Sequence, residues 1–153
     1  MNNDEMTLLR EEEKIQNQPL EEMKSDEIYD MCFACGSRNP IGLHLHFYRI
    51  DKGMVAFFTP RKEHQSYDGR MHGGLISTLL DEVMGNYIFM NEHKPAYTAR
   101  LDIRFRNPAL IGTSLKIKGT EVKRKGPLVI MEGSVTDSSG ILIAEASSHM
   151  MIK

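Results

Sequence analysis

The sequence predicts a single α+β domain in which a long antiparallel sheet wraps around one central helix. Three successive segments, each with its own spacing of apolar residues, indicate this class. Apolar residues alternate with polar ones over residues 43–59, recur at helical spacing over 73–90, and alternate again through several segments after residue 97. Because many strands follow one another and a single helix must cover them, an antiparallel sheet around that helix fits the order.

Size and composition agree with one domain. The chain has 153 residues, of which 41% are hydrophobic, and its two cysteines are too few for a disulfide scaffold. The longest apolar run is too short to cross a bilayer, and the N-terminus is acidic where a secretory leader would be basic. We therefore expect a cytoplasmic protein with no membrane association.

Charge divides the chain into two parts. Residues 1–30 hold ten acidic and three basic residues, so the net charge of −2 leaves residues 31–153 with +5. We expect 1–30 to be an acidic helical N-terminal extension, interrupted at Pro19, and 31–153 to be the sheet domain. The basic body suits an anionic ligand. Nucleic acid is not expected, because no lysine-rich block is interleaved with exposed aromatic residues.

The first strands are predicted before the helix. Leu43, Leu45 and Phe47 fall on one face of an alternating segment, and a second strand follows over Met54–Thr59. The residues at 51–53, Asp-Lys-Gly, are typical of the turn of a hairpin.

The central helix is predicted over Gly73–Met90. Leu75, Leu79 and Val83 recur at helical spacing, and neighbouring apolar residues widen the stripe over most of the circumference, so this helix should be buried. Four strands are predicted after it, with a tight turn at 137–140 between the last two. Their expected ranges are Tyr97–Arg106, Ser114–Lys123, Leu128–Asp137 and Ile141–Met151.

The start of the central helix is a candidate anion or oxyanion site. His72, Gly73 and Gly74 precede the apolar run, so no bulky side chain covers the first backbone N–H groups, which carry partial positive charge. Paired glycines are also used for a tight turn or for close packing, and the residues alone leave both interpretations open.

Asp81 is the candidate catalytic carboxylate. It lies among apolar residues of the predicted helix, where burial of a carboxylate is costly unless it is paired or used. If buried, its pKa should be raised, which suits a general base or a nucleophile. The alternative is that Asp81 and Glu82 occupy a narrow exposed face of the helix.

Helix geometry constrains how these two features can cooperate. Nine residues at about 1.5 Å each place His72 and Asp81 roughly 13 Å apart along the helix axis. They cannot act on one carbonyl from the same helix. A two-fold dimer with antiparallel helices would bring the start of one helix to the middle of the other.

Three motifs resemble those of hotdog-fold thioesterases of the phenylacetate-pathway and 4-hydroxybenzoyl-CoA type. The segment 72–82, HGGLISTLLDE, is similar to their HGG-then-acid signature. The lead-in at 32–43, CFACG followed by NPIGL, and the strand at 98–108, TARLDIRFRNP, resemble further parts of the family. The resemblance covers roughly 31–153 and implies a hotdog fold, a homodimer or dimer of dimers, and an acyl-CoA substrate.

The resemblance also implies roles for individual residues. Asp81 would be the general base or nucleophile, and the Gly73 amide would polarise the thioester carbonyl. His72 would place that carbonyl or fix the turn, and the Thr98 hydroxyl would hold the attacking water. The family often has Asn or Gln several residues before HGG, where Gln65 or Ser66 stands in this chain. The expected substrate-binding residues are Gly74 and the run Lys123, Arg124, Lys125 and Gly126, which corresponds to a loop that contacts CoA phosphates; such a run is otherwise a solvated turn.

No metal or redox cofactor is expected for this reaction, since a thioester needs only an oxyanion donor and an activated water or carboxylate. Cys32 and Cys35, with His44 and His46 downstream, have the ligand types of a zinc site. A single CxxC is a weak signal, and we expect a tight turn with two small buried side chains instead.

Two other functions use the same fold. A non-catalytic acyl-CoA sensor would be indicated by an Asp81 with a purely structural role. A hydratase or dehydratase of this fold places an Asp and a His in one site, which the spacing of His72 and Asp81 disfavours.

Overall fold

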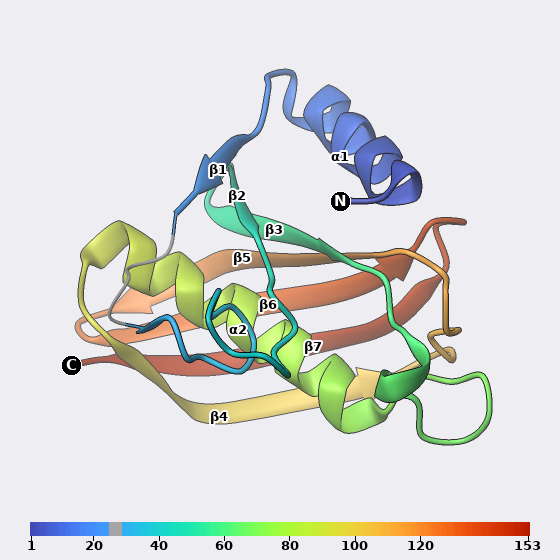
Figure 1. The fold of residues 1–153 in the computed structure, drawn as a ribbon. Coiled ribbons are helices and arrows are strands. Elements are labelled where there is room, and N and C mark those ends of the chain that lie inside the picture. The colour runs from blue at the N-terminus through green and yellow to red at the C-terminus, as the bar shows by residue number, and fades with distance from the viewer. Residues whose placement is uncertain (25–28) are drawn as a thin grey trace.

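The computed structural model describes residues 1–24 and 29–153, and it shows one antiparallel sheet wrapped around a long helix (Figure 1). The elements are α1 Asn3–Gln16, β1 Glu21–Met23, β2 Phe47–Ile50, β3 Gly53–Phe58, a 3₁₀ turn Lys62–His64, α2 Gly73–Glu92, β4 Ala96–Phe105, β5 Leu115–Lys125, β6 Leu128–Asp137 and β7 Leu142–Ile152. The strands lie in the order β1-β2-β3-β5-β6-β7-β4, and every neighbouring pair is antiparallel. The predicted α+β architecture is confirmed.

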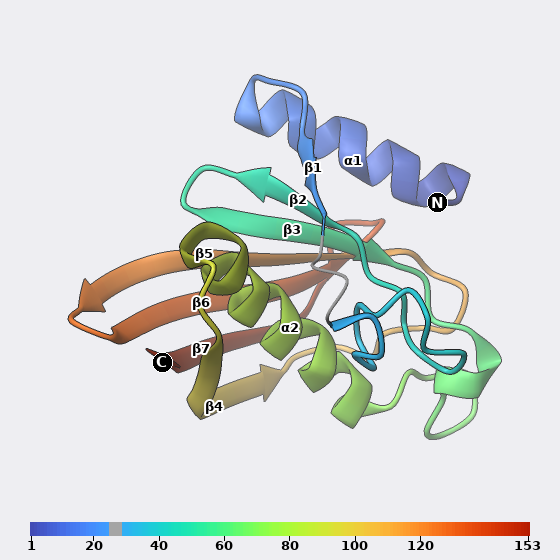
Figure 2. The same cartoon turned by 60° about the vertical axis from the view of Figure 1, so that its left-hand side comes forward.

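Helix α2 lies directly on one face of the sheet (Figure 2). Its side chains Leu80 and Met84 are fully buried against the strands. The sheet provides room for them through Gly119 on β5 and Gly133 on β6, where an added Cβ would lie 3.0 Å from Met84 Cγ and 3.0 Å from Leu80 Cδ2, respectively. Small residues therefore set how closely α2 approaches the sheet, and with it the level of Asp81 over the strands.

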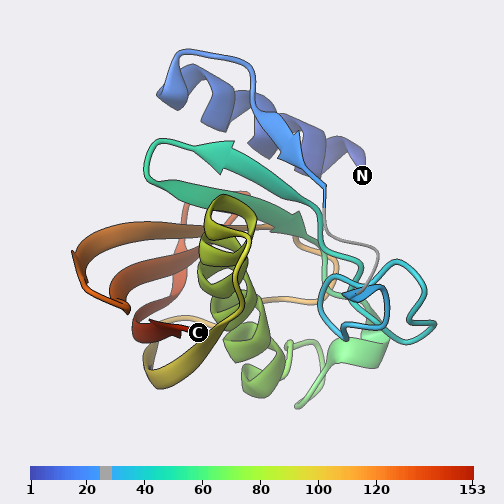
Figure 3. The same cartoon turned by 90° about the vertical axis from the view of Figure 1, so that its left-hand side faces the viewer.

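Helix α1 covers part of the other face of the sheet (Figure 3). Leu8 packs there with Ile50, Val55 and Phe57 in a second apolar cluster, so β3 is buried on both faces. This explains why β3 is apolar at every position rather than alternating.

A buried carboxylate also holds α1 on the sheet. Glu12 is fully buried and receives hydrogen bonds from Lys116 Nζ at 2.9 Å and Lys118 Nζ at 3.0 Å on β5. Burial alone would raise the pKa of Glu12, but the hydrogen bonds from Lys116, Gln16 and Lys118 outweigh it and hold that pKa below its usual value. The ion pairs therefore keep Glu12 charged on the side of α1 that faces the sheet.

The N-terminal segment is less helical than the sequence predicts. The expectation of helical structure up to residue 30 is wrong for 21–23, because these residues form β1 and pair with β2. The helix ends at Gln16, and the C-cap residue Asn17 adopts a left-handed conformation with φ of 56° and donates its N–H back to the last turn. Pro19 cannot donate a helical hydrogen bond, so the chain turns back to the sheet edge. The part of the expected helix at 25–28 lies outside the described residues.

Strand β2 begins later than predicted. The alternation is confirmed, since Leu43 and Leu45 are buried while His44 and His46 are exposed. The backbone N–H groups of Leu43 and Leu45, however, bond to carbonyl groups of the preceding loop, at Phe33 and Ala34. A left-handed His44, with φ of 54°, interrupts the extended backbone there.

Strand β4 forms one edge of the sheet. It pairs with β7 on one side only, and seven of its ten residues are exposed.

Within the described residues, neither helix combines the length and apolar character needed to cross a membrane.

Candidate active site

Asp81 and Thr98 meet between α2 and the edge strand β4. The Thr98 hydroxyl donates a hydrogen bond of 2.5 Å to Asp81 Oδ1. Asp81 is half-buried rather than fully buried in a single chain, because it faces the open edge of the sheet instead of its centre. The burial of Asp81 is thus intermediate between the two alternatives that the sequence left open, a buried carboxylate and an exposed one.

A pocket of about 230 Å³ surrounds this pair. Its walls come from the loop that carries the two cysteines, from the middle of α2 and from the start of β4, and they include Tyr29, Cys32, Cys35, Asp81, Glu82, Phe89, Ala96 and Thr98. Tyr29 packs edge-to-face on Phe89 with ring centroids 5.2 Å apart. The pocket therefore combines an apolar end with two carboxylates, an arrangement that suits a mostly apolar ligand with one polar reacting group.

The start of α2 leaves one backbone donor uncommitted. His72 is the N-cap, and its Nδ1 accepts the Gly74 N–H at 2.8 Å. The His72 carbonyl accepts the N–H groups of Leu75 and Ile76. Among the hydrogen bonds between described residues, none uses the Gly73 N–H. Of the two glycine amides expected at this site, Gly73 therefore offers a donor, while the Gly74 amide is occupied by His72.

A second pocket, of about 320 Å³, lies beside Gly73. Ser66 and Phe105 also line it, and a Cβ on Gly73 would lie 3.5 Å from the Phe105 ring. Gln65 does not reach this pocket, since it turns back and accepts the Gly69 N–H at 3.3 Å. The structure therefore brings Ser66, and not Gln65, to the helix start.

The two pockets lie apart in one chain and have no lining residue in common. Gly73 packs near Phe105 at one end of β4, whereas Asp81 bonds to Thr98 near the other end. Phe105 lies seven positions after Thr98 on β4, which corresponds to about 23 Å along the strand. The Gly73 amide and Asp81 of the same chain therefore do not face one reacting atom.

The basic run belongs to a strand rather than to a turn. Lys123, Arg124 and Lys125 lie at the end of β5, which runs two residues further than predicted, and only Gly126 begins the turn, with φ of 57°. Arg124 bonds to Glu92 and to Glu121. Burial lowers the pKa of Arg124, but these hydrogen bonds outweigh it and raise the pKa above its usual value. Arg124 is thus committed to two carboxylates, while Lys123 and Lys125 are exposed.

The cysteines meet a partner that the sequence does not indicate. The ligand atoms of Cys32, Cys35 and Glu82 all lie within 4.8 Å of one another, and Cys32 Sγ donates to Glu82 Oε1 at 3.4 Å. Burial first, and then the negative charge of Glu82, raises the pKa of the Cys35 thiol. No periodic pattern relates residue 82 to residues 32 and 35, so only the packing of the loop on α2 reveals the cluster.

The two histidines predicted as possible ligands do not join the cysteines. His44 Nε2 bonds to the Asn39 carbonyl at 2.6 Å, and His46 Nδ1 bonds to Glu22 at 2.8 Å. The expected buried turn is found for Cys35, whereas Cys32 is partly exposed.

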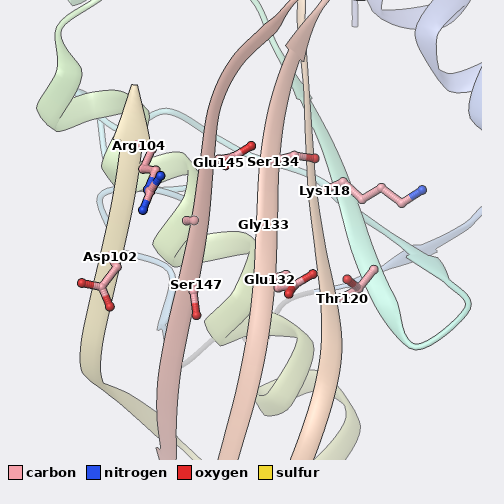
Figure 4. A pocket seen from close by; sticks show the side chains of 10 residues that line it. Asp102, Arg104, Lys118, Thr120, Glu132, Gly133, Ser134, Glu145 and Ser147 are labelled. Atoms are coloured by element: carbon pink, nitrogen blue, oxygen red, sulfur yellow. The ribbon is translucent and has the colours of Figure 1, made fainter. Parts of the chain in front are cut away.

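A further hollow, of about 580 Å³, is lined by residues of the strands β4, β5, β6 and β7 (Figure 4). Lys118 lines it and also bonds to Glu12 of α1, so the hollow lies on the face of the sheet opposite α2. Its walls carry both signs of charge, including Arg104, Glu132 and Glu145, and none of the predicted site residues. We therefore place the candidate active site at the two smaller pockets along α2.

Comparison with known proteins agrees with this fold. A thioesterase superfamily model matches residues 68–144. An uncharacterized protein of Schizosaccharomyces pombe is 32% identical over 116 residues, which cover 69% of this chain, and the chain spans 65% of the length of that relative. A solved thioesterase superfamily protein superposes with a TM-score of 0.74 at 18% identity, covering 99% of this chain and 80% of that one.

A second solved structure is a hypothetical thioesterase of Streptococcus pneumoniae with coenzyme A. Its TM-score is 0.66 at 21% identity, and the match covers 71% of this chain and 85% of the other. These neighbours share the antiparallel sheet around one long helix, which is the hotdog fold expected from the sequence motifs. The family match spans half of the chain and includes the start and middle of α2 and all of β4, so the chain belongs to the thioesterase superfamily.

Proposed function

We propose that this protein hydrolyses the thioester of an acyl-CoA to a free acid and CoA. The observation that carries the proposal is the hydrogen bond between Thr98 and Asp81, which fixes a carboxylate in a pocket on the central helix. Membership of the thioesterase superfamily supports the reaction class. The coenzyme A bound by the Streptococcus pneumoniae protein of the same fold supports the substrate class.

In the proposed reaction, Asp81 activates water or attacks the thioester carbon itself. With Asp81 as base, water adds to the carbonyl carbon and its proton passes to the carboxylate. The carbonyl oxygen becomes an oxyanion, which accepts the Gly73 N–H at the positive end of the helix dipole. The carbon–sulfur bond then breaks, and the CoA thiolate leaves and takes up a proton. The Thr98 hydroxyl donates to Asp81, and its oxygen lone pairs remain for a hydrogen bond from the water.

The proposed site contains groups from two chains. An edge strand with exposed residues is a template for pairing with another strand, and β4 is such an edge. If β4 pairs antiparallel with its copy about a two-fold axis, the Thr98 end of one strand lies beside the Phe105 end of the other. That arrangement brings Asp81 of one chain towards the Gly73 pocket of its partner. A homodimer would therefore contain two such sites.

No metal or redox cofactor takes part in this reaction, because the base and the oxyanion donor are both protein groups. The CoA phosphates require positive charge, and the exposed Lys123 and Lys125 are the basic-run side chains that remain for them. Arg124 acts through its ion pairs, which hold the end of β5 near the C-terminal end of α2 at Glu92.

A thiol-release assay across short, long and aromatic acyl-CoAs tests the proposal. We expect hydrolysis by the wild-type protein and a loss of about 10³-fold in kcat for Asp81→Asn, with an unchanged circular dichroism spectrum. Glu132→Gln, which changes an exposed carboxylate on the opposite face of the sheet, is the matched control and should keep the wild-type rate.

Two results would contradict the proposal. An Asp81→Asn variant with the wild-type rate would remove Asp81 from the mechanism. Tight binding of acyl-CoA by the wild-type protein, with no release of thiol from any substrate of the panel, would instead indicate a non-catalytic sensor.

A further inference from the structure

Two cysteines and a glutamate from separate parts of the chain converge beside the Asp81 pocket. Cys32 and Cys35 come from the loop before β2, and Glu82 comes from the middle of α2. Their ligand atoms lie within 4.8 Å of one another. We propose that Cys32, Cys35 and Glu82 bind one zinc ion, which fastens the cysteine loop to the central helix.

The spacing of the three groups fits a tetrahedral ion. Bonds of about 2.3 Å to sulfur and about 2.1 Å to a carboxylate oxygen place a sulfur and an oxygen on the same zinc about 3.6 Å apart. The distance between Cys32 Sγ and Glu82 Oε1 is 3.4 Å. All three groups thus lie at separations that rotations of their side chains can close around one ion. Two thiolates also favour zinc over the hard cations, which prefer oxygen ligands.

The backbone of the cysteine loop already presents both thiols to the helix. The Gly36 N–H donates to the Cys32 carbonyl at 2.8 Å, which closes a tight turn around the CxxC segment. A Cβ on Gly36 would lie 2.3 Å from the Asp30 carbonyl oxygen, so only glycine fits this turn. The backbone of the loop therefore holds both thiols next to Glu82.

The carboxylate is oriented by a residue outside the ligand set. Asn86 Nδ2 donates to Glu82 Oε1 at 2.6 Å and to the Glu82 carbonyl at 3.2 Å. Such a hydrogen bond fixes the rotamer of a carboxylate ligand and leaves further lone pairs for a metal ion. An ion here would release the two thiol protons and compensate the negative charge that three anionic ligands bring together.

The described residues supply three protein ligands, so water or a ligand atom would occupy the fourth position. Cys32, Cys35 and Glu82 all line the pocket of Asp81, and that fourth position therefore faces the same space. The ion would fix one wall of the pocket, since it joins the cysteine loop to the residue next to Asp81. The inference does not depend on hydrolysis, because metal binding is measured without substrate.

Metal content of the full-length protein tests the inference. The protein is expressed with added zinc, purified without chelator, dialysed against metal-free buffer and analysed by mass spectrometry of the elements. We expect about one zinc per chain in the wild type and almost none in Cys32→Ser or Cys35→Ser. Glu82→Gln should retain the thiols but hold zinc more weakly, and Asp81→Asn, from the same pocket, should keep the wild-type content.

A second measurement covers variants that fail to fold. In the wild type, zinc should protect both thiols from a thiol reagent, and a chelator should restore their reactivity. Replacing zinc by cobalt should give a thiolate-to-metal charge-transfer band with the visible spectrum of a tetrahedral ion.

Three results would overturn the inference. The first is a wild-type protein that takes up no zinc and has two reactive thiols. The second is a disulfide between Cys32 and Cys35 that persists under the reducing conditions of purification. The third is an equal zinc content in folded Cys35→Ser protein, which would place the metal elsewhere. Loss of hydrolysis in Asp81→Asn with full zinc content would separate this inference from the proposed reaction.

Discussion

The Thr98 hydroxyl on the edge strand β4 donates a 2.5 Å hydrogen bond to Asp81 Oδ1 on the central helix α2. The same hydroxyl lies 3.4 Å from the sulfur of Met150 on β7, so its rotamer is held from both sides. A carboxylate that accepts such a bond is oriented at the sheet edge instead of rotating into solvent. We therefore expect the Thr98 hydroxyl to support the role of Asp81 in the proposed reaction.

Thr98→Val should slow thioester hydrolysis without affecting the fold. Valine keeps the β-branched shape but removes the donor to Asp81, and a hydrogen bond to a charged group contributes about 1.5–3 kcal/mol. We expect kcat to fall about 10- to 100-fold, measured by thiol release, while Thr98→Ser keeps most of the activity. Equal rates for the valine and serine variants would show that the hydroxyl has no part in the reaction.

Gly73→Pro tests the backbone donor at the start of α2. Proline is well tolerated at the first position of a helix, and His72, with φ of −61° and ψ of 131°, has the extended conformation that a residue before proline prefers. The substitution removes the N–H and keeps the helix, so kcat should fall about 10²- to 10³-fold. Gly73→Ala retains the N–H and is the matched control. Similar losses in both variants would point to steric effects near Phe105 instead of a missing donor.

Mixing two inactive variants tests the composite site. If Asp81 of one chain acts with Gly73 of the other, a heterodimer of Asp81→Asn and Gly73→Pro has one intact site and one doubly changed site. Unfolding and refolding equal amounts together should restore about a quarter of the wild-type activity, because half of the dimers are mixed and each has one of two sites. Activity no higher than that of the separate variants would place both groups in one chain or remove one of them from the site.

The ion pairs of Glu12 should make the attachment of α1 depend on pH. The pKa of Glu12 lies below its usual value of 4.5, so its contribution to stability is complete above that pH and is lost as the pH falls through the lower native pKa. We expect Glu12→Gln to lower the free energy of unfolding by about 1–3 kcal/mol at pH 7. Urea titrations at pH 7 and pH 3.5 should show a smaller acid-induced loss in this variant than in the wild type.

Glu11→Gln, an exposed position on the same helix, is the control for that comparison and should behave like the wild type. An equal acid-induced loss in Glu12→Gln and in the wild type would mean that other carboxylates dominate the acid sensitivity.

Local signals determined much of this protein. Alternating apolar residues gave the strands, the wide apolar stripe of 73–90 gave the buried helix, and the glycines after His72 marked its start. The separation of His72 from Asp81 along the axis of one helix follows from helix geometry alone. These features need only neighbours in the sequence, which is why they could be predicted without the fold.

Contacts between distant segments were decided only by the tertiary structure. The sequence did not indicate that Glu82 meets Cys32 and Cys35, or that β1 extends the sheet. It also did not indicate that Glu12 of α1 is buried against Lys116 and Lys118 of β5. Nor did it distinguish the Gly73 amide, which has no partner among the described residues, from the Gly74 amide, which His72 caps. Each of these depends on how α2, the loops and the sheet edges pack in space, and no period or spacing in the chain encodes that packing.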